Sequence, residues 1–142
     1  MIQVILLAVI AAIFWGTAPV FDKAALRTAT PITGVVIRSI VIALAMLSLL
    51  LVSGARAEIA AVSKRELAYF AIGGLMAGFA GQLIYFYALK FGHASIVVPV
   101  IAGLYPLVAA IWGIVIFREP VTAAKLVGAA LIISGVIVIR LR

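Results

Sequence analysis

The sequence contains no cysteine, one histidine and four acidic residues among 142. Without cysteine the chain can form neither disulfides nor thiolate metal sites, and one histidine cannot supply the ligands of a zinc centre. We therefore expect no metal and no cofactor. Charged residues make up 11% of the chain, against about 25% in soluble domains. This shortage of charge argues against a water-soluble surface.

Enzymatic chemistry also lacks its usual residues. The sequence shows no acid pair and no nucleophile beside a base, and His93 lies in a connection where we expect water around it. We therefore expect no enzymatic activity. A net charge of +7 would suit a nucleic-acid partner, but the cations lie between apolar runs instead of clustering on one face. Nucleic acid is therefore not an expected partner.

What the sequence does have is apolar length, because 68% of its residues are hydrophobic. A soluble domain of this size could not bury so much apolar surface. Five runs reach or approach the ~20 residues that cross a ~30 Å hydrocarbon core. They span residues 2–21, 31–52, 67–89, 95–117 and 121–139. The sequence predicts an all-α, multi-pass integral membrane protein with five transmembrane helices, folded as a single domain over residues 1–142.

The junctions between these runs carry signals for helix starts. Thr30 followed by Pro31 places a capping hydroxyl before a proline at the first helical position. Ser63 and Glu66 have the spacing of a capping box. Glu119 and Pro120 are interpreted as the start of the fifth helix.

The basic residues give almost no orientation signal. Orientation follows the side with more Lys and Arg in its short loops. One side carries Arg56, Lys64, Arg65, Arg118 and Lys125, and the other carries Lys23, Arg27, Lys90, Arg140 and Arg142. Equal numbers on both sides favour dual topology, in which copies insert in either direction. The alternative is one orientation fixed by a feature other than these charges.

Small residues at spacings of three and four mark the helix faces that pack against protein. Trp15 and Arg38 lie on such stripes, and Gln82 and Tyr85 lie at or beside another. Arg38 is about 10 Å along its helix from Pro31, at ~1.5 Å per residue. It can either snorkel to the interface or face a polar cavity and bind a carboxylate or phosphate.

These stripes predict a substrate pathway. Its candidate side chains are one cation, neutral donors and aromatic surfaces: Trp15, Arg38, Gln82, Tyr85, Tyr105 and Trp112. Asp22 is placed at the end of the first helix, so no acid is expected in mid-membrane. That placement disfavours export of cations in exchange for protons at a central carboxylate.

Two prolines fall on one face of the fourth helix. Pro99 and Pro106 each remove a backbone hydrogen bond and favour a kink. Freed carbonyls are tolerated in a membrane where they meet protein or a water-filled cavity. We interpret this helix as a gating wall of the pathway, with curvature for packing as the alternative.

Several motifs together resemble the EamA branch of the drug/metabolite transporter superfamily. The resemblance covers nearly the whole chain and rests on Phe14-Trp15-Gly16, Arg38, Tyr87-Ala88-Leu89, Ala94-Ser95, Pro99, Pro106, Arg118-Glu119-Pro120 and the stretch 128–136. That last stretch is also similar to the dimerising helix of small multidrug resistance proteins, which have four helices and an essential acid in the first. Typical EamA proteins carry two inverted five-helix halves, and this chain resembles one such repeat.

The resemblance implies a secondary transporter, an exporter of amino acids or related small metabolites in the cell inner (plasma) membrane. It also implies pairing of two copies, and the even charge distribution favours an antiparallel homodimer with Gly128 and Gly135 at the contact. Two other functions remain open. They are a non-transporting membrane partner subunit and a broad-specificity exporter like the small multidrug resistance proteins.

Overall fold

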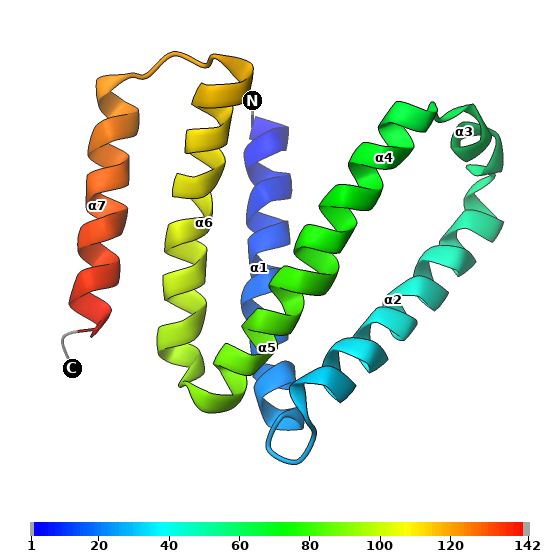
Figure 1. The fold of residues 1–142 in the computed structure, drawn as a ribbon, viewed down its shortest axis with the longest axis horizontal. Helices are drawn as coiled ribbons and strands as arrows, with labels where there is room; N and C mark the ends of the chain where they lie inside the picture. Colours follow the sequence, from blue (N-terminus) through cyan, green and yellow to red (C-terminus); the bar gives the residue numbers. More distant parts are fainter. Residues whose placement is uncertain (1, 141–142) are drawn as a thin grey trace. The chain divides into compact units, whose positions relative to one another are not determined.

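The computed structural model describes residues 2–140, and the regular elements in this range are helices (Figure 1). In chain order they are α1 (Ile2–Ala25), α2 (Pro31–Ser53), α3 (Arg56–Ala61), α4 (Lys64–Gly73), the π-helix η1 (Gly74–Gly81), α5 (Gln82–Phe91), α6 (Ala94–Phe117) and α7 (Ala123–Arg140). Arg142, one of the orientation charges, lies outside the described residues.

Within the described range, four helical segments are long and apolar enough to cross a membrane. They are α1, α2, the continuous segment Lys64–Phe91 and α6, with mean hydropathies between 1.6 and 2.7. In the most apolar 18-residue stretch of each segment, at most 6% of the residues are buried within the chain, so lipid or other protein must cover the remaining surface. The all-helical membrane class is thus confirmed. Helix α7 is apolar but shorter, and the count of five spans stays a prediction.

Several helix bounds differ from those expected. Helix α1 continues four residues past Phe21 to Ala25, and the short helix α3 was not expected. Helix α7 begins at Ala123, two residues late, because the hydroxyl of Thr122 accepts a hydrogen bond from the Lys125 amide (3.3 Å). The interpretation of Glu119 and Pro120 as the start signals of this helix was therefore wrong, and Thr122 has that place.

The other predicted helix starts are confirmed. Thr30 caps α2 by accepting the Thr33 amide at 3.2 Å, with Pro31 in the first turn. Ser63 and Glu66 form the expected reciprocal capping box at α4. These contacts satisfy amide donors that a helix start would otherwise leave without partners.

The third predicted helix is interrupted by η1. Eight residues, Gly74–Gly81, adopt π-helical geometry between α4 and α5. A Cβ built on Gly81 would lie 3.0 Å from the carbonyl oxygen of Met76, five residues earlier. A wider turn changes which side chains share a face. The small-residue stripe expected beside Gln82 and Tyr85 assumed α-helical spacing, which does not hold across Gly74–Gly81.

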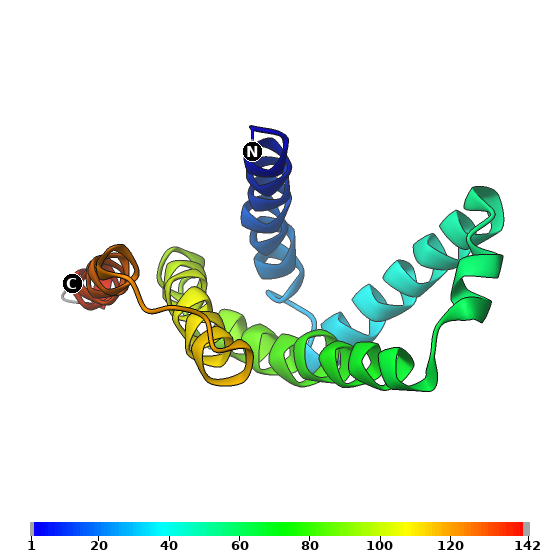
Figure 2. The same ribbon diagram turned by 90° about the horizontal axis from the view of Figure 1, so that it is seen from above.

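The chain divides into two compact units, and each is described by itself. One comprises residues 20–91, and the other the residues on either side of it. In unit 20–91, α5 packs against α2. The two helices lie together where α2 begins and α5 ends, and α2 then diverges from α4 towards α3 (Figures 1 and 2).

Close packing in unit 20–91 occurs at this junction. Its buried apolar residues are Leu26, Val35, Phe86 and Leu89. Gly34 allows the Phe86 ring to approach α2, because a Cβ at position 34 would lie 2.7 Å from a ring carbon. This contact fixes how α5 presents its side chains to α2.

In the other unit, α6 and α7 lie side by side and antiparallel (Figures 1 and 2). Gly103 of α6 leaves room for Val136, whose methyl would be 2.8 Å from an added Cβ. Helix α6 ends at Arg118, which has a left-handed backbone (φ 54°). The Glu119 carboxylate then folds back over Gly113 and pairs with Lys125 at 3.0 Å.

Candidate functional site

The most polar contact among the spanning helices joins α1 to α2. Arg38 Nη1 donates to Asp22 Oδ2 at 2.7 Å, and the two side chains are 33% and 16% exposed. This is the one hydrogen bond that joins them, so the pair is monodentate. Arginine–carboxylate pairs are often bidentate. Within the described residues, the remaining guanidinium nitrogens and the second carboxylate oxygen keep their hydrogen-bonding capacity.

Asp22 lies at the end of the first helix, as expected. Helix α1 continues to Ala25, so the acid belongs to its last turn. Ionisable groups within a membrane pair with one another because an isolated charge is expensive there. Asp22 therefore compensates the charge of Arg38, and the choice between snorkelling and facing a polar cavity stays a prediction.

Helix α5 brings further polar groups to this pair. The Arg38 guanidinium lies 5.9 Å from the centre of the Phe86 ring, which contacts Tyr85 edge to face at 5.7 Å. Tyr85 lies within electrostatic range of both Asp22 and Arg38. Tyr85 and Gln82 are three residues apart and share one side of α5. We call Asp22, Arg38, Gln82 and Tyr85 the polar cluster.

Two atoms of the polar cluster lack partners. The Gln82 side-chain nitrogen and the Tyr85 hydroxyl are buried and form no hydrogen bond within the described residues. A buried polar group without a partner is destabilising by roughly 1–3 kcal/mol, and such groups in native proteins call for an explanation. By contrast, the hydroxyls of Thr17, Ser48 and Ser134 are each satisfied by the carbonyl four residues earlier.

Two lysines hold the polar cluster's helices together at their ends. Lys23 Nζ donates to the Leu89 carbonyl at 2.6 Å, and Lys90 Nζ donates to the Leu26 and Ala29 carbonyls at 2.6 and 3.1 Å. Helix C-termini leave carbonyls without partners and attract cations. We call this arrangement the lysine clasp.

The other predicted pathway residues lie in the second unit. Trp15 on α1, with Tyr105 and Trp112 on α6, are 71%, 66% and 55% exposed. Arg38, Gln82 and Tyr85 belong to unit 20–91, and these three aromatic residues belong to the other unit. Their place on a pathway stays a prediction.

The remaining predicted residues also lie in the second unit. Pro99 and Pro106 both lie inside α6. A Cβ on Gly128 or Gly135 of α7 would meet nothing within 4 Å. These two glycines are therefore not occupied by packing within the chain, and their role as a dimer contact stays a prediction.

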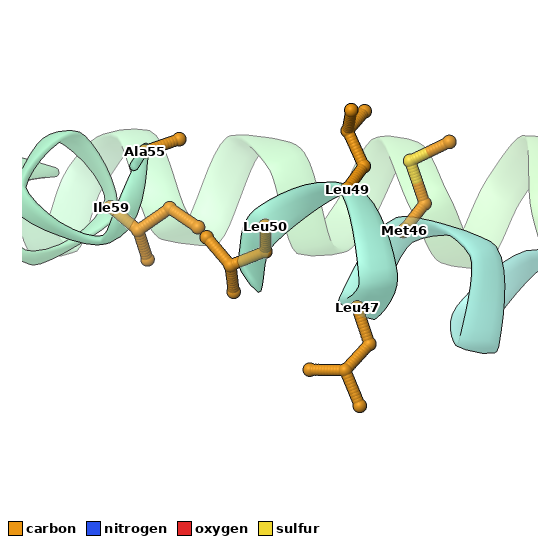
Figure 3. A pocket seen from close by; sticks show the side chains of 6 residues that line it. All are labelled: Met46, Leu47, Leu49, Leu50, Ala55 and Ile59. Carbon is orange, nitrogen blue, oxygen red and sulfur yellow. The ribbon is translucent and has the colours of Figure 1, made fainter. Parts of the chain in front are cut away.

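Two further features carry no polar chemistry. A hollow of about 440 Å³ is lined by Met46, Leu47, Leu49, Leu50, Ala55 and Ile59 (Figure 3). Its lining is apolar, and Leu47 points away from Leu49, as expected for an open surface depression.

Within residues 2–140, no group of three or more His, Cys, Asp or Glu side chains is placed to hold a metal ion.

Several apolar spans with a charge pair between two of them define a multi-pass membrane protein. The sequence matches the EamA-like transporter family over residues 2–141, and the chain belongs to that family. It is also 28% identical over 137 residues to an uncharacterized protein of Methanocaldococcus jannaschii, and the match covers 96% of each chain. No solved structure matches the sequence. The family consists of transporters and not typically of enzymes.

Sequence reasoning missed Asp22 as the partner of Arg38. A signal was present, because the turn at residues 26–30 makes α1 and α2 neighbours, and Asp22 before the turn is the one acid near Arg38 after it. Ending the first helix at Phe21 removed the acid from the membrane and hid the pairing. The chain order alone therefore contained the information needed to pair them.

Proposed function

We propose that this chain is a secondary transporter that exports amino acids or related small metabolites across the inner (plasma) membrane. The observation that best supports this function is the polar cluster. In it, the Asp22–Arg38 ion pair lies beside two buried donors that have no partner among the described residues. Transport sites are built from a few polar groups in an otherwise apolar setting. Family membership supports the general activity, and the cluster supports a small polar substrate.

Reconstitution tests the proposal directly. The purified protein in liposomes should exchange a labelled amino acid for unlabelled substrate inside, and Arg38→Ala should abolish this flux while the protein stays in the membrane. Lys64→Ala is the control, since it removes a cation too, but one at an exposed position outside the polar cluster. Full flux in Arg38→Ala would remove the polar cluster from the pathway.

We further propose that one five-helix EamA-like domain pairs with a second copy as an antiparallel homodimer. Few residues of the spanning helices are buried within the chain, at most 6% in the most apolar 18-residue stretch of each, so each has a large surface for lipid or a partner. Secondary transporters bind substrate where two inverted repeats meet and alternate by rocking one against the other. A two-fold axis in the membrane plane gives two copies opposite orientations.

Orientation is measured with a C-terminal tag in intact and in permeabilised cells. Dual topology predicts tags on both sides of the membrane. Three added lysines on one side should bias insertion and lower flux, and an oppositely biased copy should restore it. A single orientation in every molecule would exclude the antiparallel dimer and leave a parallel dimer or a heteromer.

We propose that α6, with its two prolines, acts as the gate of the pathway. Pro99 and Pro106 interrupt the backbone hydrogen bonding of α6, which makes it the candidate for movement. Replacing both by Ala should slow turnover more than it weakens binding, because straightening the helix affects the transition between states. Unchanged flux in the double variant would remove the gating role.

One observation supports a second candidate function. Because Asp22 lies inside α1 and is only 16% exposed, the chain has an acid in its first helix, as the small multidrug resistance proteins do. Proton-coupled export of organic cations therefore becomes the alternative. An imposed proton gradient would then drive uptake of a cationic dye into inverted vesicles. A non-transporting partner subunit would show no flux at all and would co-purify with another complex.

A further inference from the structure

We propose that the polar cluster is a receptor for zwitterions, in which the ammonium of an α-amino acid takes Asp22 and its carboxylate takes Arg38. This inference rests on the proposed transport function and specifies the chemistry of its substrate. It starts from the geometry of a charge pair made by a single 2.7 Å hydrogen bond between two helices.

A zwitterion carries one positive and one negative group, which match the two charges of this pair. Opening the Asp22–Arg38 contact exposes one carboxylate and one guanidinium, and an α-amino acid presents an ammonium and a carboxylate that pair with them. One intramolecular ion pair is thereby replaced by two intermolecular pairs. The total charge of the cluster is zero before and after binding, so no uncompensated charge is left in a poorly solvated place.

The same balance predicts rejection of ions. A carboxylate without an ammonium would pair with Arg38 and leave Asp22 alone, and an amine without a carboxylate would leave Arg38 alone. Breaking a partly buried pair and leaving one charge without a partner is strongly unfavourable. The polar cluster therefore selects by net charge as well as by shape.

The neighbouring residues have a role in the bound state. The Gln82 nitrogen and the Tyr85 hydroxyl are buried donors without partners, and a carboxylate has more acceptor sites than one guanidinium fills. Tyr85 lies within electrostatic range of Asp22 and Arg38, and Gln82 precedes it by three residues on the same helix. Each can donate to the substrate carboxylate once Arg38 has turned from Asp22 towards it.

Packing around Arg38 limits the change of its partner to the guanidinium itself. The Phe86 ring that lies 5.9 Å from the Arg38 guanidinium is itself only 2% exposed. Gly34 on α2 and the lysine clasp hold that ring and the end of α5 in place. Arg38 can thus exchange partners over a fixed aromatic surface.

The test uses matched triads of probes that differ only in their charges. One triad is L-phenylalanine, 3-phenylpropionate and phenethylamine, and a second is L-leucine, 4-methylvalerate and isoamylamine. Binding to the purified wild-type protein is followed by the shift in its unfolding temperature, and transport by counterflow in liposomes. We expect the amino acid to bind at least tenfold more tightly than either analogue.

Single substitutions in the charge pair should change which probe of a triad binds best, and not only weaken the binding of the amino acid. Asp22→Asn leaves Arg38 as a lone cation, so the carboxylate analogue should become the best ligand of each triad. Arg38→Gln should favour the amine instead. Tyr85→Phe and Gln82→Leu should weaken zwitterion binding several-fold without inverting the order, and Glu58→Gln in α3 should change nothing.

Each outcome bears on the inference. If Asp22→Asn or Arg38→Gln fails to fold, the inference is still tested by the ligand preference of the wild-type protein and by the affinity of the Tyr85→Phe variant. Wild-type flux that favours a pure anion or cation would overturn the inference and leave transport standing. Variants that lose stability with an unchanged preference would show a purely structural ion pair. Absence of binding and flux for both triads would overturn this inference, and flux of another solute would still preserve the transporter.

Discussion

Lys23 of α1 caps the C-terminal end of α5, and Lys90 of α5 caps the C-terminal end of α1. Lys23 reaches the Leu89 carbonyl at 2.6 Å and the Lys90 carbonyl at 3.4 Å, while Lys90 reaches back to Leu26 and Ala29. The two cations therefore act at the negative ends of α5 and α1. The relation matters because these helices carry Tyr85 and Asp22 of the polar cluster.

Removing one half of the lysine clasp should destabilise the unit. Lys90→Met keeps most of the side-chain volume but loses two hydrogen bonds from a charged donor, so we expect a loss of about 2 kcal/mol in unfolding free energy. Chemical denaturation of the purified protein in detergent measures it. Lys64→Met, at an exposed position of α4, is the control and should stay within experimental error.

Gly34 should be intolerant of a methyl group. Gly34→Ala would place its Cβ 2.7 and 2.9 Å from two ring atoms of Phe86, and forcing a buried ring aside is destabilising by about 1–3 kcal/mol. Gly16→Ala is the control because its Cβ would meet nothing within 4 Å. If the clash is responsible, Phe86→Leu in the same chain should recover part of the loss in melting temperature.

Arg118 should accept glycine with a gain in stability. Its φ of 54° places a residue with a side chain in the left-handed region, which is unfavourable by about 1 kcal/mol. Arg118→Gly should therefore raise the melting temperature. Gly54→Ala is the reverse experiment, since Gly54 has φ 71° as the C-cap of α2, and it should lower the melting temperature. A drop in both variants would contradict the backbone explanation.

The glycines of α7 separate contacts within the chain from contacts between chains. Gly128→Leu and Gly135→Leu should weaken self-association, measured by cross-linking in membranes, while each folded chain keeps its melting temperature. Gly103→Leu should instead lower stability, because position 103 packs against Val136 and Ile132. Equal cross-linking in the α7 variants would exclude this helix from the dimer contact.

The apolar runs and capping signals predicted much of the fold. Composition and run length define a membrane protein because few other structures satisfy the backbone in lipid, and Thr30 and Ser63 cap the helices expected of them. Helix ends without such signals were less certain. The first helix continued past Phe21 because Asp22 and Lys23 both find partners there, and a hydropathy pattern does not record partners.

The polar cluster was predicted only in part. Arg38, Gln82 and Tyr85 were identified from their faces on separate helices, but Asp22 was excluded by a helix boundary four residues too short. The π-helix was missed as well, since its glycine-rich sequence fits an α-helical stripe equally well. Both errors concern how a helix continues, which depends on contacts made after it forms.

The π-helical stretch also determines where this protein can change length. A π turn closes its hydrogen bond one residue later than an α turn, so one residue can leave Gly74–Gly81 and the segment can become α-helical while the faces of α4 and α5 keep their directions. A deletion within α5 would instead rotate the residues before it by about 100° relative to those after it. In an alignment of related chains, a one-residue gap in this helix should therefore fall inside η1 and not beside Gln82 or Tyr85.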